Sequence, residues 1–199
     1  KLSGISSGFL ALDDLLGGLH KSDLVILAGR PSMGKTALAT NIAYNAASNK
    51  NEGKSVAFFS LEMSAEQLAN RILAEQASIS SDQIRRGKLN KDDFSKLSQV
   101  SKEISSNKLF IDDTPAINVS TLRTRARRLK RKLDTELGLI VVDYLQLMRG
   151  SKKYENRVQE ISEITQGLKS VSKELNVPIL ALSQLSRAVE QRDDKKPQL

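Results

Sequence analysis

The chain contains no cysteine and no tryptophan, and aromatic residues make up only 4% of its 199 residues. The absence of cysteine excludes disulfides and cysteine-ligated zinc and fits a reducing compartment. No apolar run approaches the roughly 18 residues that a membrane-spanning helix requires, and no secretory signal opens the chain. We therefore expect a cytoplasmic protein without a membrane segment.

The length fits one domain with a sizeable core and does not require two. Residue 1 is lysine rather than methionine, and the last residues, 191–199, are mostly polar. We therefore interpret residues 1–199 as a single domain cut from a longer protein.

A phosphate-binding loop pattern lies near the amino end. Residues 29–36 read Gly-Arg-Pro-Ser-Met-Gly-Lys-Thr and match G-x-x-x-x-G-K-[S/T] at every fixed position. An apolar run at 24–28 precedes the loop and apolar residues at helical spacing follow it, so the loop joins a strand to a helix. This context disfavours the alternative of a chance glycine-rich turn. The residues expected to bind the nucleotide here are Gly29, Arg30, Pro31, Ser32, Met33, Gly34, Lys35, Thr36 and Ala37.

The chemistry of the loop requires these residue types. Gly29 and Gly34 let the backbone bend so that its N–H groups converge on anionic oxygens, and the helix N-terminus adds a favourable dipole. The Lys35 ammonium can reach the β- and γ-phosphates, and the Thr36 hydroxyl can ligate Mg²⁺. The loop therefore predicts a P-loop NTPase site.

Short apolar runs alternate with stretches of helical periodicity along the chain. The expected strands are 24–28, 55–61, 109–111, 137–143 and 177–183. The expected helices are 10–16, 37–48, 65–77, 81–86, 92–105, 120–135 and 157–175. This alternation predicts an α/β fold with a mostly parallel sheet and helices on both faces. Ligands then lie beyond the carboxyl ends of the strands, where the sequence has Gly29, Glu62, Asp112, Asp143 and Gln184.

Two acids at strand ends are candidates for chemistry. Asp143 follows an apolar strand and can hold Mg²⁺ opposite Thr36. No acid follows Asp143, since residue 144 is tyrosine. The base that activates the attacking water must then come from another strand end, and Glu62 has that location. The alternative for Glu62 is an acid that caps the helix after Ser64.

Gln184 can sense or orient the γ-phosphate, and the alternative of a polar strand terminus stays open. A GTPase is disfavoured. Residues 90–93 read Asn-Lys-Asp-Asp and fit N-K-x-D, but they follow a polar stretch rather than a strand. Residues 143–146, Asp-Tyr-Leu-Gln, lack the glycine of D-x-x-G.

The net charge is +8, with 31 basic and 23 acidic residues. A dense basic run at 123–132 contains leucine and alanine at helical spacing, so it predicts an amphipathic helix with a basic outer face. That face is either a solvated helix surface or a contact for nucleic acid. No aromatic residue interrupts the run, which weakens base stacking as its function.

Four motifs resemble, in order and spacing, those of DnaB-type replicative DNA helicases. They occupy residues 29–36, 60–64, 142–148 and 181–187. The resemblance implies a RecA-like ATPase domain acting as a ring-shaped homohexamer around single-stranded DNA. It implies ATP and Mg²⁺ between subunits, with hydrolysis driving translocation and duplex unwinding. It also implies primase and a helicase loader as partners, at a nucleoid-associated replication fork.

The resemblance also implies residue roles. It assigns phosphate and Mg²⁺ binding to Lys35 and Thr36, metal binding to Asp143, the catalytic base to Glu62 and γ-phosphate sensing to Gln184. It makes Arg71 a nucleotide-facing residue, where helical periodicity alone suggests a surface cation. The family has an N-terminal helical domain, and DNA-contacting and trans-acting basic residues beyond position 199. We therefore expect residues 1–199 alone to bind nucleotide, hydrolyse it slowly and unwind little.

Two other functions stay open from the sequence. One is a RecA-like ATPase that controls protein or filament assembly, which single-stranded DNA would not stimulate. The other is a loader-binding or ring-scaffold module whose nucleotide site is only structural.

Overall fold

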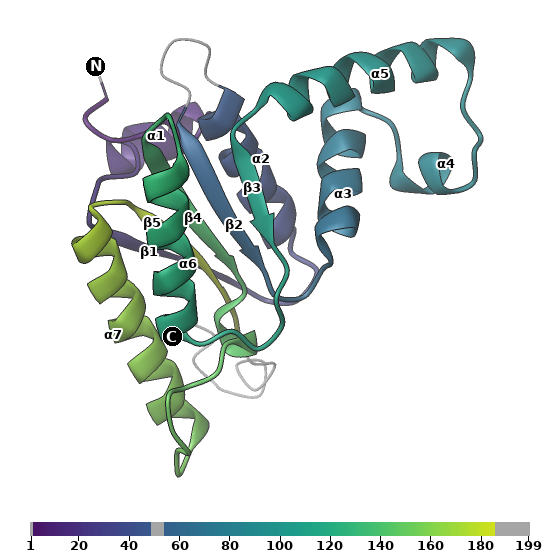
Figure 1. Cartoon of the computed structure of the whole chain (residues 1–199). Coiled ribbons are helices and arrows are strands. Elements are labelled where there is room, and N and C mark those ends of the chain that lie inside the picture. Colours follow the sequence, from purple (N-terminus) through teal and green to yellow (C-terminus); the bar gives the residue numbers. More distant parts are fainter. Residues whose placement is uncertain (1, 49–53, 186–199) are drawn as a thin grey trace.

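The computed structural model describes residues 2–48 and 54–185 (Figure 1). Within these ranges, five strands form one sheet in the order β1-β5-β4-β2-β3, and every pairing is parallel. The strands are β1 (Leu24–Gly29), β2 (Ser55–Ser60), β3 (Leu109–Asp112), β4 (Leu137–Asp143) and β5 (Ile179–Gln184). The predicted α/β class with a parallel sheet is confirmed.

The strands lie close to their predicted positions. The last strand is the main exception, because it begins at Ile179 rather than at residue 177. Pro178 has no backbone N–H and so cannot donate a hydrogen bond to a neighbouring strand. Its carbonyl still accepts a hydrogen bond from Ile140 N at 3.0 Å.

The helices connect these strands and also match the expected ranges closely. They are α1 (Leu10–Leu16), α2 (Lys35–Ser48), α3 (Ala65–Ala77), α4 (Ser81–Arg85), α5 (Lys91–Ser106), α6 (Val119–Lys132) and α7 (Arg157–Leu175), with a short 3₁₀ helix, η1 (Leu145–Leu147), after β4. The basic helix α6 ends at Lys132, three residues before the expected end, where Leu133 takes an extended conformation.

Helices cover both faces of the sheet, as predicted. On one face, α6 and α7 pack their buried residues Leu122, Ala126, Ile164 and Leu168 against the strands (Figure 1). On the other face, α2 and α3 contribute Ile42, Ala43, Leu68 and Ile72 to a second core. These two cores fix the sheet and hold the carboxyl ends of the strands together at one edge.

Helices α3, α4 and α5 form an arm that extends from the side of the sheet where β3 lies (Figure 1). A small third cluster of buried residues, Ala77, Ile79 and Leu97, joins these helices. The turn before α3 has a capping box, in which Ser64 Oγ accepts from Gln67 N at 3.1 Å and Gln67 Oε1 accepts from Ser64 N at 3.0 Å. Such a box fixes the start of α3 immediately after Glu62 and Met63.

Two predicted segments lie wholly or partly outside the described residues. They are the polar turn at 49–54, of which only Lys54 is described, and the last motif beyond Leu185. Among the described helices, none combines the length and hydropathy that a membrane crossing requires.

Candidate nucleotide-binding site

The phosphate-binding loop has the backbone that its sequence predicts. Ser32 and Gly34 have φ angles of 63° and 80°, so the chain turns through the left-handed region twice before α2 begins at Lys35. Such alternation directs successive N–H groups into one concave surface that suits an anion. At the other end of the loop, a Cβ on Gly29 would lie 3.1 Å from the Lys35 Cδ. Glycine at 29 therefore makes room for the lysine side chain.

Lys35 reaches back across the loop to the sheet. Its ammonium donates to Gly29 O at 2.6 Å and to Ser183 O at 3.0 Å. Burial lowers the pKa of Lys35 from its ordinary value, and the nearby carboxylates of Asp143 and Glu62 oppose that shift. The ammonium is thus held at the carboxyl ends of β1 and β5.

Thr36 and Asp143 are in direct contact. The Thr36 hydroxyl donates to Asp143 Oδ2 at 2.9 Å, which joins α2 to the end of β4. Asp143 as a whole residue is 3% exposed. Burial raises its pKa, as does the charge of Glu62, whereas the Thr36 hydrogen bond, Lys35 and Arg71 lower it. A buried carboxylate of this kind is stabilised by a nearby cation.

These two oxygen groups fit a Mg²⁺ ion. Mg²⁺ prefers oxygen ligands and is usually bound by one or two protein groups together with water and phosphate oxygens. Within the described ranges, no group of three or more histidine and acidic residues forms a protein-only metal site. The donor set at Thr36 and Asp143 therefore fits an ion held jointly with a phosphate.

Glu62 lies two residues after β2, near Asp143. Leu61 N donates to Asp143 O at 2.9 Å, and Ser60 Oγ donates to Met63 O at 2.8 Å, so the turn that carries Glu62 is fixed on both sides. Glu62 itself is exposed. Capping of α3 falls to Ser64 and to Asp113, whose carboxylate accepts from Ala65 N at 2.8 Å. The alternative of Glu62 as the capping acid therefore has no support in these contacts.

A cavity of about 240 Å³ brings the predicted residues together. Its lining residues are Pro31, Ser32, Met33, Gly34, Lys35, Thr36, Glu62, Arg71, Asp143, Tyr144 and Gln184. Gly29 and Arg30 line an adjoining cavity of about 500 Å³ on the other side of the loop. Ala37 lines neither; its carbonyl accepts from Thr40 Oγ1 at 2.9 Å inside α2. Tyr144 was not predicted as a site residue, although it directly follows Asp143.

Arg71 lines this cavity and is not a simple surface cation. Its Nε donates to Glu75 Oε1 at 3.1 Å on the same helix. Glu75 Oε2 also accepts from Thr40 Oγ1 at 2.9 Å and from Asn41 Nδ2 at 3.3 Å, both on α2. Glu75 thus ties Arg71 to the helix that follows the phosphate-binding loop. The i,i+4 spacing of Arg71 and Glu75 is itself a local signal of an ion pair, but no sequence signal marks the contacts of Glu75 with α2.

Asp112, which the sequence places at the same edge of the sheet, does not line this cavity. Arg125 Nη1 donates to both of its carboxylate oxygens, at 3.0 and 2.7 Å. Burial by itself raises the pKa of Asp112, but hydrogen bonds from Arg125 and Thr114 and the charge of Arg125 outweigh it and lower that pKa. Since β3 is at the edge of the sheet opposite β1, with β2 between it and β4, Asp112 lies away from the ends of β1, β4 and β5.

A larger cavity, of about 760 Å³, lies elsewhere among the described residues, at the amino ends of the strands. The one carboxylate that lines it, Glu136, already pairs with both lysines there, with Lys21 at 2.6 Å and with Lys54 at 2.5 Å. Parallel sheets bind ligands at the opposite, carboxyl edge. The smaller cavity at the phosphate-binding loop is therefore the better candidate site.

Comparisons with known proteins agree with the motifs. The family described as "DnaB-like helicase C terminal domain" matches residues 4–199. The replicative DNA helicase DnaB of Rickettsia prowazekii is 58% identical to this chain over an alignment of 204 positions. The alignment covers 98% of this chain and 42% of that protein.

Two solved structures are also similar. One is a DnaB-like replicative helicase described with its interactions with primase, at a TM-score of 0.92 and 37% identity over 100% of this chain and 47% of the other. The second is an ATPase domain with the same TM-score and identity, of which 70% is covered. Among the curated relatives, the chain spans less than half of the length of each full protein that it matches. From the family match over residues 4–199, and from these similarities, the chain belongs to the DnaB-like helicase C-terminal domain family.

Proposed function

We propose that residues 1–199 are one ATPase domain, the motor of a replicative DNA helicase. The observation that carries this proposal is the contact between the Thr36 hydroxyl and Asp143 Oδ2, 2.9 Å apart, inside a cavity that Lys35, Glu62 and Gln184 also line. Phosphate, metal and attacking water each have a side chain of suitable chemistry there. Membership of the helicase family supports DNA unwinding as the use of that ATPase.

Each residue has a distinct proposed role at this site. The loop N–H groups and Lys35 bind the phosphates, and Thr36 and Asp143 hold Mg²⁺, which neutralises phosphate charge when bound. Glu62 orients the attacking water and accepts its proton. Arg71 faces the nucleotide from α3, and Gln184 contacts the γ-phosphate from the end of β5. Residues 29–37 as a group surround the phosphate chain.

The wider assembly belongs to the same proposal. Six copies form a ring around single-stranded DNA, with ATP between neighbouring copies and hydrolysis driving translocation. Primase and a helicase loader are the proposed protein partners. A primase partnership is supported by the similar helicase whose interactions with primase have been described.

The test is ATP turnover by the full-length protein with and without single-stranded DNA, using Glu62→Gln as the variant. We expect DNA to stimulate turnover, and Glu62→Gln to reduce turnover by at least about 100-fold while nucleotide affinity stays within about twofold, since a general base contributes about 10²–10⁴. Glu66→Gln, an exposed acid on the first turn of α3, is the matched control and should leave turnover unchanged. Equal turnover by Glu62→Gln and the parent protein would refute the assignment of Glu62.

The second candidate is a RecA-like ATPase that controls assembly of protein filaments. It shares the nucleotide site and differs in its response to DNA. Turnover that ignores single-stranded DNA, together with nucleotide-dependent changes in particle mass, would favour this candidate over the helicase.

A further inference from the structure

Gln146 does not itself line the proposed nucleotide cavity, but it is hydrogen-bonded to Gln184, which does. Its Oε1 accepts from Gln184 N at 3.1 Å, and its Nε2 donates to Gln184 O at 3.2 Å and to Ser183 Oγ at 3.0 Å. The side chain is partly buried. Gln146 therefore contacts both polar groups of the Gln184 backbone with a single amide.

This contact replaces sheet pairing at the place where pairing stops. Strands β4 and β5 are paired from Ile140↔Ile179 to Val142↔Ala181, and the chain then leaves β4 for η1. On the other side of β5, Leu185 N donates to Gly29 O at 3.0 Å, so β1 still supports the strand. A side-chain amide has one acceptor and two donors, which lets Gln146 act as the missing neighbour of Gln184.

The backbone that carries the Gln146 side chain is itself held by hydrogen bonds. In η1, Leu147 N donates to Tyr144 O and Met148 N donates to Leu145 O, both at 3.0 Å. The guanidinium of Arg157, at the start of α7, donates to the Gln146 carbonyl. The backbone of Gln146 is thus held by η1 and α7 while its side chain holds the end of β5.

We propose that Gln146 is a positioning residue that fixes Gln184 at the γ-phosphate end of the nucleotide site. This inference rests on the proposed function, in which Gln184 contacts the γ-phosphate. The Lys35 ammonium bonds Ser183 O, next to Gln184, so the same strand end also carries the phosphate-binding lysine. Two hydrogen bonds to the Gln184 backbone restrict the direction in which its side chain leaves the strand.

The experiment compares affinity for a non-hydrolysable ATP analogue with affinity for ADP, both with Mg²⁺, by titration calorimetry on the full-length protein. Gln146→Met keeps the length of the side chain and removes its hydrogen bonds. We expect it to lower the preference for the ATP analogue about fivefold, the effect of roughly 1 kcal/mol of neutral hydrogen bonding, with ADP affinity unchanged. Gln184→Ala should lower the same preference, and the double variant should lose no more than Gln184→Ala alone.

Two further variants separate positioning from general stability. Gln166→Met, at an exposed position of α7, is the matched control and should behave as the parent chain. Gln146→Glu keeps an acceptor for Gln184 N and should retain part of the preference, even if Gln146→Met lowers the thermal unfolding temperature.

The results distinguish this inference from the function on which it depends. A full-length parent protein that binds neither nucleotide would refute the proposed function and this inference with it. If Gln184→Ala loses the preference but both Gln146 variants keep it, or if the losses add in the double variant, Gln146 does not position Gln184 and only this inference fails.

Discussion

Thr36 and Asp143 are 107 positions apart in the sequence, yet their side chains are hydrogen-bonded. At the scale of single residues, the site also contains two pairs in which a side chain supports a cavity residue: Glu75 accepts from the Arg71 guanidinium, and Gln146 bonds the Gln184 backbone. Neither Glu75 nor Gln146 is among the residues that line the cavity. Small changes in a supporting side chain should therefore alter nucleotide binding without removing any group that contacts the phosphates.

The hydroxyl of Thr36 provides a residue-scale prediction. Thr36→Val has nearly the same shape but lacks the oxygen, so we expect the Mg²⁺-dependent part of ATP affinity to fall by about tenfold, or roughly 1.4 kcal/mol. Thr36→Ser restores an oxygen and should recover most of that affinity. Nucleotide titrations with and without Mg²⁺ measure the effect. Equal Mg²⁺ dependence in Thr36→Val and the parent chain would exclude a metal contact from this hydroxyl.

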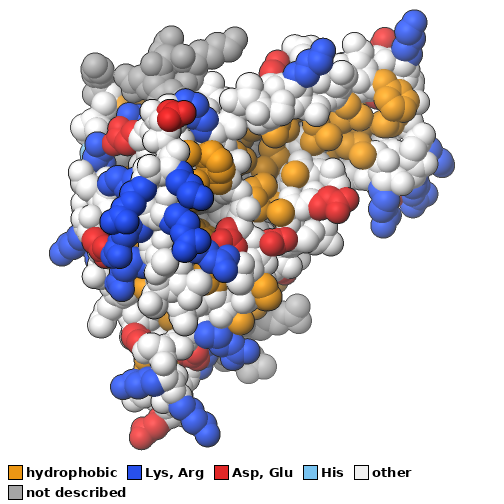
Figure 2. Space-filling view, in the orientation of Figure 1, with side chains coloured by type: hydrophobic (Ala, Val, Ile, Leu, Met, Phe, Trp, Pro, Cys, Tyr) orange, Lys and Arg blue, Asp and Glu red, His pale blue; other side chains and the backbone are white. Residues whose placement is uncertain are grey.

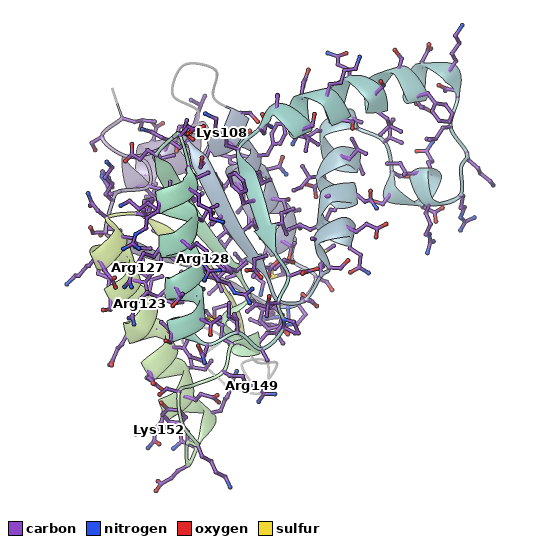
Figure 3. The ribbon with its side chains drawn as sticks, in the orientation of Figure 1. Lys108, Arg123, Arg127, Arg128, Arg149 and Lys152 are labelled. Atoms are coloured by element: carbon purple, nitrogen blue, oxygen red, sulfur yellow. The ribbon has the colours of Figure 1, made fainter. Side chains whose placement is uncertain are left out.

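At the scale of elements, the basic helix α6 is partly neutralised by its neighbours. Its Arg123 and Arg127 both pair with Glu174 of α7, and Arg125 pairs with Asp112 at the end of β3. Figure 3 shows Arg123 and Arg127 on the side of α6 that lies beside α7. These contacts give several of the cations a role in holding α6 in place, so the basic run does not by itself require a polyanionic partner.

Four exposed cations of α6 have no acidic partner among the described residues. Lys130 donates to the Leu175 carbonyl, and the other three are Arg128, Arg131 and Lys132. Figure 2 shows lysine and arginine side chains gathered over α6 and its surroundings. If this face contacts single-stranded DNA, replacing Arg128, Arg131 and Lys132 by alanine should reduce the slope of log affinity against log salt by up to about 2, at about 0.7 per phosphate contact.

The matched control for that element is α5. Lys91, Lys96 and Lys102 are exposed there, and replacing them by alanine changes the net charge by the same amount. Filter binding or fluorescence anisotropy at several salt concentrations provides the slopes for the full-length protein. Equal slopes for the α6 variant, the α5 variant and the parent would identify the α6 face as a solvated helix surface.

At the scale of the whole molecule, the proposed nucleotide site and a cluster of ion pairs lie at opposite edges of the sheet. The cavity proposed to bind nucleotide lies at the carboxyl ends of the strands, whereas an ion-pair cluster lies at their amino ends. There Glu136, just before β4, accepts from Lys21 and Lys54, and the hydrogen bonds from these two lysines lower its pKa to about 2. Changes to this cluster should therefore affect folding stability while nucleotide affinity stays constant.

Glu136 provides a pH prediction with a definite sign. Because its pKa is lowered from 4.5 to about 2 by folding, its contribution is fully present above pH 4.5 and is lost as the pH falls towards 2. The side chains are 32–53% exposed, so solvent screening limits the contribution to about 1 kcal/mol or less. Glu136→Gln should lower the free energy of unfolding by that amount at pH 7 and have no effect near pH 2.

Urea unfolding at several pH values measures this difference. Glu155→Gln, at an exposed position in the loop before α7, is the control and should follow the parent chain at every pH. A constant difference between Glu136→Gln and the parent from pH 7 to pH 2 would mean that the carboxylate charge is not the cause.

The sequence by itself determined the fold class and most members of the site. Apolar runs and helical periodicity are local patterns, and the phosphate-binding loop is contiguous. Parallel strands bring their carboxyl ends to one edge, so Gly29, Asp143 and Gln184 could be placed together without knowing the order of the strands. The roles of these residues stay predictions until the variants are measured.

Only the tertiary structure decided which polar residues at that edge enter the cavity. The order β1-β5-β4-β2-β3 places Asp112 on the outer strand, where Arg125 binds it, and brings α3 close enough for Arg71 to line the cavity. The pairing of Gln146 with Gln184 likewise depends on β4 and β5 being neighbours. The physical reason is that such contacts join residues distant in the chain, and their spacing in the sequence carries no signal of which strands are adjacent.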